Sequence, residues 1–312
     1  GLVSFGVLVA FLQYVQRFYR PIGDLAENYN VLQASFAASV RLRELLATKP
    51  ELADPPHPVS PPRQGSLEFR HVTFAYDPHD PPALREVSFA VQAGERVAVV
   101  GHTGAGKSTL VNLLLRFYDP QAGEVLVDGV DVRHWRRSEL RSRFAVVLQD
   151  VDCFAGTIRD NVSLGRPGIS DQRILWALEQ VQARELLERL PLGLDTVLGE
   201  RGTGLSVGER QLVAFARALV RDPAILVLDE ATAHVDTETE RLVQNALLKA
   251  RCGRTTILIA HRLNTVRHAD RILVLHKGRI CEMGTHDELM RRGGLYRTLV
   301  ELQERQERLG GA

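Results

Sequence analysis

The chain has 312 residues, a length that suggests about two domains of roughly 150 residues each. Hydrophobic residues make up 45% of it, charged residues 25%, and the formal net charge is +1, which favours a globular protein and argues against a nucleic-acid-binding surface. The cysteines at 153, 252 and 281 form neither a CxxC pair nor a metal-ligand spacing, as is typical of a reduced, cytosolic environment.

The chain begins with an apolar segment, residues 1–15, interrupted only by Ser4 and Gln13. It is shorter than the about 20 residues that span a bilayer, and it lacks the basic start of a signal peptide. It is either a buried core helix or a membrane helix whose beginning is cut off. We favour the second interpretation. Arg17 and Arg20 follow directly, which indicates that this end lies on the cytoplasmic side.

A helical pattern continues beyond this segment to about Ala47, with apolar residues at 25, 29, 32, 36 and 40. Pro21 is expected to kink this helix without ending it. Residues 50–62 hold six prolines and predict a stiff linker. A new domain is expected to start near Ser66.

The pattern then changes to short β-rich runs. Residues 67–76 and 87–91 predict antiparallel strands. Residues 157–220 are mostly helical in pattern and predict an inserted helical subdomain. Further short strands are expected at residues 96–100, 125–127, 145–148, 225–228, 256–259 and 272–275. Because helical stretches separate the later strands, the core is expected to be a mostly parallel α/β sheet.

The strongest motif is residues 101–108, GHTGAGKS, which fits GxxxxGK[ST] between a predicted strand and a predicted helix. Its glycines let backbone N–H groups surround an anion, and the following helix adds the positive end of its dipole. Lys107 is suited to the β- and γ-phosphates of a nucleotide, and the hydroxyl of Ser108 to Mg²⁺. The motif therefore predicts a phosphate site.

Two carboxylates, Asp229 and Glu230, follow the apolar run at 225–228. Acids at the end of a buried strand are costly unless they serve a purpose. Asp229 is suited to the Mg²⁺ shell, and Glu230 to polarising the attacking water as general base. The alternative is a helix-capping acid pair, which the independent phosphate loop makes less attractive.

In their order, these motifs resemble the nucleotide-binding domain of the ABC transporter family, exporter branch, over about residues 65–305. The resemblance implies that Tyr76 stacks on adenine, that Gln149 contacts Mg²⁺ and connects to the membrane domain, and that His261 touches the γ-phosphate. Taken alone, the three residues also fit ordinary packing, an unremarkable strand end and a core histidine. Residues 199–202 resemble the exporter X-loop, although Glu200 and Arg201 also fit a solvated pair.

Residues 205–211, LSVGERQ, resemble the signature motif of the family. Ser206 and Gly208 are expected to begin a helix that continues through Val220, and a helix N-terminus can receive a phosphate. In the family this phosphate belongs to ATP held by the other domain. The resemblance thus implies a head-to-tail dimer with two ATP molecules at its interface.

The resemblance gives a complete set of expected site residues. The catalytic ones are Glu230, His261, Gln149 and Lys107, and the metal-binding ones are Ser108, Gln149 and Asp229. The nucleotide-binding ones are Tyr76, Gly101, Thr103, Gly104, Ala105, Gly106, Lys107, Ser108, Thr109, Gln149 and Asp229, with Ser206 and Gly208 acting in trans. The implied cofactors are ATP and Mg²⁺.

The signature departs from the family at Val207, where glycine is usual, and at Glu209, where glutamine is usual. Residues 233–236 read AHVD where Ser-Ala-Leu-Asp is usual. A branched side chain and a negative charge should weaken the site that this signature completes. This combination resembles one subunit of an asymmetric, heterodimeric exporter, and harmless drift within a homodimer stays open.

The expected fold is α/β: a P-loop NTPase with a RecA-like parallel core, an antiparallel β subdomain and an inserted helical subdomain, preceded by a long transmembrane/cytoplasmic helix. The expected domains are 1–48, the end of a transmembrane domain; 49–65, the linker; 66–306, the nucleotide-binding domain; and 307–312, a tail. The full-length protein is expected to be a multi-pass protein of the cell membrane, with the nucleotide-binding domain in the cytoplasm.

The implied function is an ATP-hydrolysing subunit of an exporter, partnered by a second half-transporter and without nucleic acid. One alternative is an ATP-binding clamp with weak hydrolysis in an asymmetric heterodimer. Another is a soluble ABC ATPase of DNA repair or translation. The apolar N-terminal segment and the near-neutral charge argue against the soluble ATPase.

Overall fold

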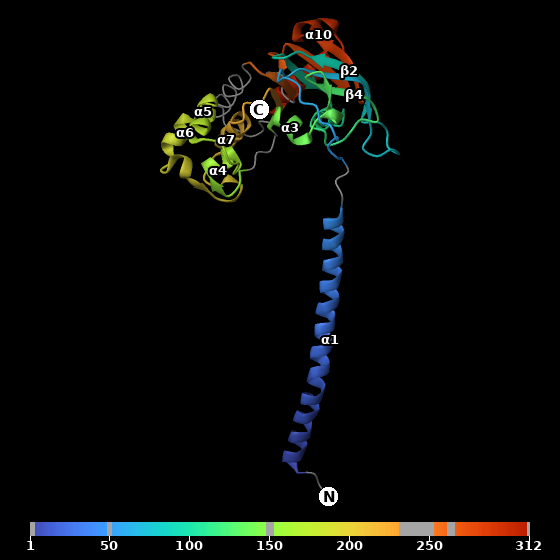
Figure 1. Ribbon diagram of the computed structural model, residues 1–312, viewed down its shortest axis with the longest axis vertical. Coiled ribbons are helices and arrows are strands. Elements are labelled where there is room, and N and C mark those ends of the chain that lie inside the picture. Colours follow the sequence, from blue (N-terminus) through green and yellow to red (C-terminus); the bar gives the residue numbers. More distant parts are fainter. Residues whose placement is uncertain (1–3, 49–51, 148–152, 231–252, 261–265, 311–312) are drawn as a thin grey trace. The chain divides into compact units, whose positions relative to one another are not determined.

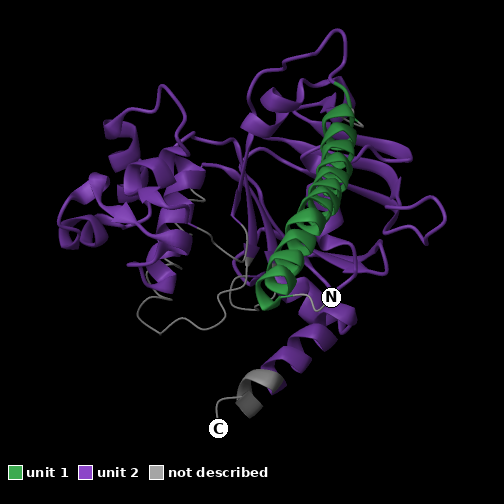
Figure 2. Cartoon of the chain, turned by 90° about the horizontal axis from the view of Figure 1, so that it is seen from below, with its two compact units in different colours: residues 1–53 green, residues 54–312 purple. Residues whose placement is uncertain are grey.

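The computed structural model describes residues 4–48, 52–147, 153–230, 253–260 and 266–310, with side chains for all of these except Glu230, Ala260 and residues 306–310. The chain divides into two compact units, residues 1–53 and 54–312, which Figure 2 colours separately. The predicted residues Gln149 and His261 and the segment 233–236 lie outside the described residues.

The described part of the first unit contains the helix α1 (Phe5–Ala47), 43 residues long (Figure 1). It runs through Pro21, so the expectation that this proline does not end the helix is confirmed. Its large apolar side chains, such as Phe11 and Phe36, are exposed. Within the described part of the chain, we find no helix that combines the length and the apolar character needed to cross a bilayer.

The second unit is built on a six-stranded sheet in the order β12-β11-β3-β10-β9-β6. Neighbouring strands from β11 to β6 are parallel, and β12 pairs antiparallel with β11. The predicted parallel α/β core is therefore confirmed. The strands are β3 (Arg96–Val100), β6 (Phe144–Val147), β9 (Ile225–Glu230), β10 (Thr255–Ala260), β11 (Arg271–His276) and β12 (Arg279–Gly284).

Strand β3 shows why these strands are continuously apolar. Successive side chains of a strand point to opposite faces of the sheet. Ala98 and Val100 belong to one hydrophobic cluster, whereas Val97 and Val99 belong to another. Both faces of the sheet are thus covered, as parallel sheets require, and both sets of side chains must be apolar.

A second sheet has the order β2-β1-β4-β5 and is antiparallel, as the sequence predicted for its first two strands. Across β1 and β2, the rings of Phe69 and Phe89 stack with centroids 4.7 Å apart. A third, two-stranded sheet pairs β7 with β8. The strands are β1 (Leu67–Phe74), β2 (Leu84–Val91), β4 (Ala122–Val127), β5 (Val130–Asp131), β7 (Gly156–Thr157) and β8 (Val197–Leu198).

The predicted helical insertion lies between β6 and β9 and packs around α7, whose contacts include α4 and α5 (Figure 1). Its apolar residues, among them Ile158, Ile174 and Val213, join the cluster that contains Val100. The α-helices of the second unit within the described residues are α2 (Lys107–Leu114), α3 (Arg137–Ser142), α4 (Ile158–Ser163), α5 (Asp171–Gln180), α6 (Arg184–Arg189), α7 (Val207–Leu219), α10 (His286–Arg292) and α11 (Leu295–Gly310).

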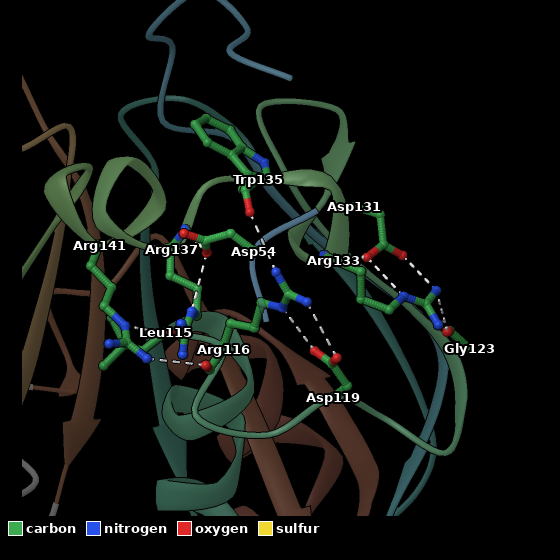
Figure 3. A network of polar contacts seen from close by, with 10 residues as sticks. All are labelled: Asp54, Leu115, Arg116, Asp119, Gly123, Asp131, Arg133, Trp135, Arg137 and Arg141. Atoms are coloured by element: carbon green, nitrogen blue, oxygen red, sulfur yellow. Dashed lines mark hydrogen bonds and ion pairs between the residues drawn. The ribbon is translucent and has the colours of Figure 1, made fainter. Parts of the chain in front are cut away.

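The proline-rich segment follows the surface of the second unit from residue 54 onward. The carboxylate of Asp54 accepts hydrogen bonds from the backbone N–H and the Nε of Arg137, at 3.0 and 3.1 Å (Figure 3). Further along, the Pro61 carbonyl accepts from Arg143 at 2.8 Å. Between them, the backbone N–H of Val59 donates to the carbonyl of His134 at 2.9 Å, and the Ser60 hydroxyl donates to Glu139, so the segment is held by both accepted and donated hydrogen bonds.

Figure 3 shows how arginines fix the far end of α2. The last carbonyls of a helix lack intrahelical partners. Arg141, on α3, donates to the carbonyls of Leu115 and Arg116, at 3.0 and 3.2 Å. The buried side chain of Arg116 pairs with Asp119 at 3.0 Å and also donates to the carbonyl of Trp135. The helix that begins at Lys107 is therefore anchored at its C-terminal end.

We predict that Arg143→Met lowers the free energy of unfolding by about 3 kcal/mol, because breaking a buried ion pair strands its partner. The partner is Asp128, whose side chain is 1% exposed and lies 3.9 Å from the Arg143 guanidinium. Urea unfolding followed by circular dichroism measures the change. The control Arg184→Met removes an exposed pair with Glu188 and should match the wild type. Equal stability of the two variants would show that the buried pair is dispensable.

Candidate functional site

The predicted phosphate loop, residues 101–106, connects β3 to α2. Gly101 has a φ of +155° and Gly106 a φ of +107°, values that side-chain-bearing residues rarely adopt. A Cβ on Gly101 would press into the carbonyl oxygen of Leu275, and one on Gly106 would lie 2.8 Å from the carbonyl oxygen of Ala83. Only glycine fits both positions, so the conformation of the loop is fixed by its neighbours.

Lys107 is the first residue of α2, and its side chain is buried, with 6% of the residue exposed. Its ammonium donates to the carbonyls of Gly101 and His102, at 2.7 and 3.2 Å, and so bends back over the loop. Burial lowers the pKa of Lys107, and the charge of Asp229 works against that shift. A desolvated cation in a glycine loop attracts an anion strongly.

The other predicted loop residues flank Lys107 along the chain and differ in exposure. Thr103 and Gly104 are exposed, and Ser108 is exposed in the first turn of α2. Ala105 and Thr109 are buried. The first N–H groups of a helix have no intrahelical acceptor, so they are available to an anion at this end of α2.

The strand register brings Asp229 to the same edge of the sheet as the loop. Asp229 pairs with Ile259 of β10, which pairs on its other side with Val99, two residues before Gly101. Adjacent strands are about 4.8 Å apart, so the backbones at Asp229 and Val99 lie about 10 Å apart.

Glu230 is the last residue of β9. Strands β6 and β10 are parallel to β9 and end at the same edge, with Val147 and Ala260, just before the predicted Gln149 and His261.

Tyr76 lies beside α2, with half of its surface exposed. Its hydroxyl is 3.2 Å from the Thr109 hydroxyl and accepts a hydrogen bond from Asn112 at 3.0 Å. Its ring makes edge-to-face contacts with Phe74 and Tyr118, with centroids 5.0 and 5.1 Å apart. Sequence analysis missed Asn112, although its spacing of three from Thr109 places both on one face of a helix.

The signature residues lie in the helical insertion. Ser206 caps α7, and its hydroxyl accepts from the N–H of Glu209 at 3.3 Å. Gly208 is buried in the first turn, so the prediction that Ser206 and Gly208 begin this helix is confirmed. Across the described residues, no hydrogen bond or ion pair connects Ser206 or Gly208 to the phosphate loop.

Glu209 was expected to add an opposing charge, and the structure shows that this charge is largely engaged. One carboxylate oxygen accepts from the N–H of Ser206 at 2.7 Å, completing a capping box. The other pairs with Arg189 of α6. Val207, by contrast, is 45% exposed. Arg189 was not found from the sequence, because nothing local connects it to a residue 20 positions away.

The glycine loop, the buried lysine and the acid-terminated strand define this domain as a P-loop nucleotide-binding domain. Comparison with known proteins shows which family this domain resembles. The family described as ABC transporter matches residues 84–233. The chain therefore carries the nucleotide-binding domain of the ABC transporter family. The predicted fold class is confirmed.

Several relatives are similar over nearly the whole chain. A probable multidrug resistance ABC transporter ATP-binding/permease protein, YheH of Bacillus subtilis, is 49% identical over 98% of this chain and 45% of its own length. A fatty acid ABC transporter ATP-binding/permease protein of Mycobacterium bovis is 44% identical over 95% of this chain and 47% of its own length. The chain thus spans about half the length of the curated relatives it matches.

A solved structure, that of a bacterial Atm1-family ABC exporter with ATP bound, is also similar. It is 41% identical, with a TM-score of 0.78, and the match covers 97% of this chain and 53% of that one. The match therefore includes most of the first unit as well as the nucleotide-binding domain.

We predict that Gly101→Ala lowers the free energy of unfolding by about 3 kcal/mol, because the new methyl group displaces the Leu275 carbonyl. It should also weaken ATP binding. The matched control is Gly129→Ala, at a φ of +77° with open space around the Cβ, which adds only backbone strain of about 1 kcal/mol. Thermal unfolding measures the stability of the two variants, and ATP titration measures their affinity for ATP. Equal effects of the two substitutions would contradict a sterically fixed loop.

Proposed function

We propose that this chain is an ATP-hydrolysing subunit of an ABC exporter, in which ATP-driven dimerisation and hydrolysis are coupled to efflux of a substrate across a membrane. The observation that supports this most is the buried Lys107 ammonium, held in the glycine loop at the edge where β9 ends in Asp229 and Glu230. The permease and exporter names of the relatives support the membrane location.

In the proposed ATP complex, each of these residues has a role. The loop amides and Lys107 hold the phosphates, with the charge of Lys107 directed at the β- and γ-phosphates. Tyr76 provides a half-exposed aromatic face for adenine. The further nucleotide-binding residues of the proposal are Gly101, Thr103, Gly104, Ala105, Gly106, Ser108 and Thr109, with Gln149.

The residues at this edge also fit Mg²⁺. This cation prefers oxygen ligands, keeps several waters and uses few protein groups. The exposed Ser108 hydroxyl and the partly exposed Asp229 carboxylate are such oxygens, and Asp229 acts electrostatically on Lys107. Ser108, Asp229 and Gln149 would hold the ion, which supplies neutralisation of phosphate charge when bound.

Hydrolysis then falls to Glu230 and His261. Glu230 ends a buried strand, and a carboxylate there can accept the proton of the attacking water. His261 follows directly after β10, the neighbouring strand, and is assigned to the γ-phosphate. An intact general base favours hydrolysis over the alternative, an ATP-binding clamp with weak turnover.

We predict that Lys107→Ala weakens ATP binding at least tenfold, because it removes the cation of the loop. Glu230→Gln should leave binding intact and lower turnover at least about 100-fold, the usual contribution of a general base. Both are measured as ATP binding and phosphate release in the transporter assembled with its partner in membranes. Glu179→Gln, an exposed carboxylate on α5, is the control. Unchanged turnover in Glu230→Gln would favour the clamp.

The partner is a second half-transporter, and we favour a heterodimer over a homodimer. In either assembly the N-terminus of α7, with Ser206 and Gly208, meets ATP held by the other subunit. The branched Val207 side chain is exposed beside that end. The Glu209 carboxylate also lies there, although Arg189 offsets its charge. Both departures support a slower site wherever this signature is used.

We predict little ATP turnover by the subunit purified alone, because both sites of a homodimer would use the departing signature. Restoring the usual residues with Val207→Gly and Glu209→Gln should raise turnover several-fold. Arg189→Ala should lower turnover in the wild type, because it leaves the charge of Glu209 without this partner. The same substitution should have no effect on turnover once Glu209 is replaced by glutamine. Steady-state phosphate release measures all three. Robust wild-type turnover without a partner would contradict the asymmetric assembly.

A further inference from the structure

The candidate base site has a feature that the phosphate motif does not explain: Tyr76 is held from several directions although half of it is exposed. Its hydroxyl is bonded to α2, its ring contacts two other aromatic rings, and the backbone before it is bonded to Gln121, which precedes β4. An exposed tyrosine that only covers the core needs no such support.

The first support is Asn112 on α2. Its side-chain Nδ2 donates to the Tyr76 hydroxyl at 3.0 Å, and the Thr109 hydroxyl lies 3.2 Å from the same oxygen. Its own backbone carbonyl accepts from Phe117 at 2.8 Å, at the end of the helix. Asn112 therefore connects the ring of Tyr76 to the helix that begins with Lys107.

The second support is Gln121, just before β4. Its side-chain amide accepts from the N–H of Ala75 at 2.9 Å and donates to the Ala75 carbonyl at 2.7 Å. Its backbone N–H also donates to the Thr73 carbonyl at 3.1 Å. This paired bonding reproduces one step of a β-ladder and fixes the backbone of the residue that precedes Tyr76.

We propose that Asn112 and Gln121 are positioning residues for the adenine base and act on it through Tyr76. The proposal rests on the proposed function, in which ATP binds at this loop with its base on Tyr76. Asn112 sets the direction of the ring, and Gln121 sets the position of its backbone. The base and the phosphates are thereby recognised by one rigid body.

The energetic reason is preorganisation. A side chain that is already held in its bound orientation loses less conformational freedom when a ligand arrives, and loss of one such restraint corresponds to about three- to tenfold in affinity. Only ligands that carry a base should show this loss. Inorganic tripolyphosphate, which shares the phosphates of ATP but has no base, should be unaffected.

The test titrates the full chain with ATP and with inorganic tripolyphosphate. Asn112→Leu keeps the side-chain volume and removes the hydrogen bond; we expect it to weaken ATP binding about three- to tenfold and to leave tripolyphosphate binding unchanged. Gln121→Met should act in the same way. In a Tyr76→Phe background, Asn112→Leu should have no further effect, whereas Gln121→Met should keep its effect, because Gln121 acts through the backbone.

An unchanged ATP affinity in Asn112→Leu, or equal losses for ATP and tripolyphosphate, would overturn the proposal. If Asn112→Leu fails to fold, Tyr76→Phe decides, because it keeps the ring and removes the hydroxyl through which Asn112 and Thr109 hold it. Failure of the proposed function looks different: the wild type would then bind neither ligand, and Lys107→Ala would change nothing.

Discussion

The site depends on a buried cation. Lys107 is 6% exposed, and its ammonium is held by two loop carbonyls. This arrangement exists only because Gly101 has no side chain to strike the Leu275 carbonyl. Desolvation makes the charged ammonium less favourable and lowers the pKa of Lys107, with Asp229 opposing the shift. A bound triphosphate supplies the negative charge that this desolvated cation lacks.

Contacts hold α2 in place along its length. Its first residue is Lys107, its residue Asn112 donates to Tyr76, and the carbonyls of the two residues that follow it, Leu115 and Arg116, accept from Arg141. Arg141 belongs to α3, so hydrogen bonds connect α3 to the C-terminal end of α2. The proline-rich segment bonds to the N-terminus of α3 through Asp54, so hydrogen bonds also connect this segment to α3.

Features encoded in short, contiguous stretches were predictable from the sequence, and those made by distant residues were not. The strand at 96–100, the loop and the helix starting at Lys107 follow one another, so local pattern sufficed. Strand ends differed where pattern is weak: β2 begins at Leu84 and not at 87, because ladder pairing with Phe74 extends it. Gln121 and Arg189 were missed, because their partners lie 46 and 20 residues away.

The two unusual residues of the signature, Val207 and Glu209, should not affect the N-terminus of α7 to the same extent. An N-terminus offers a few N–H groups and a partial positive charge, and Glu209 already uses the N–H of Ser206. In the proposed assembly, a phosphate at this end would share it with the Glu209 carboxylate, but Arg189 brings a compensating charge. Nothing comparable offsets Val207, because steric bulk cannot be neutralised. In the proposed assembly, the exposed branched side chain of Val207 is therefore the stronger obstacle to an ATP molecule held by a partner subunit.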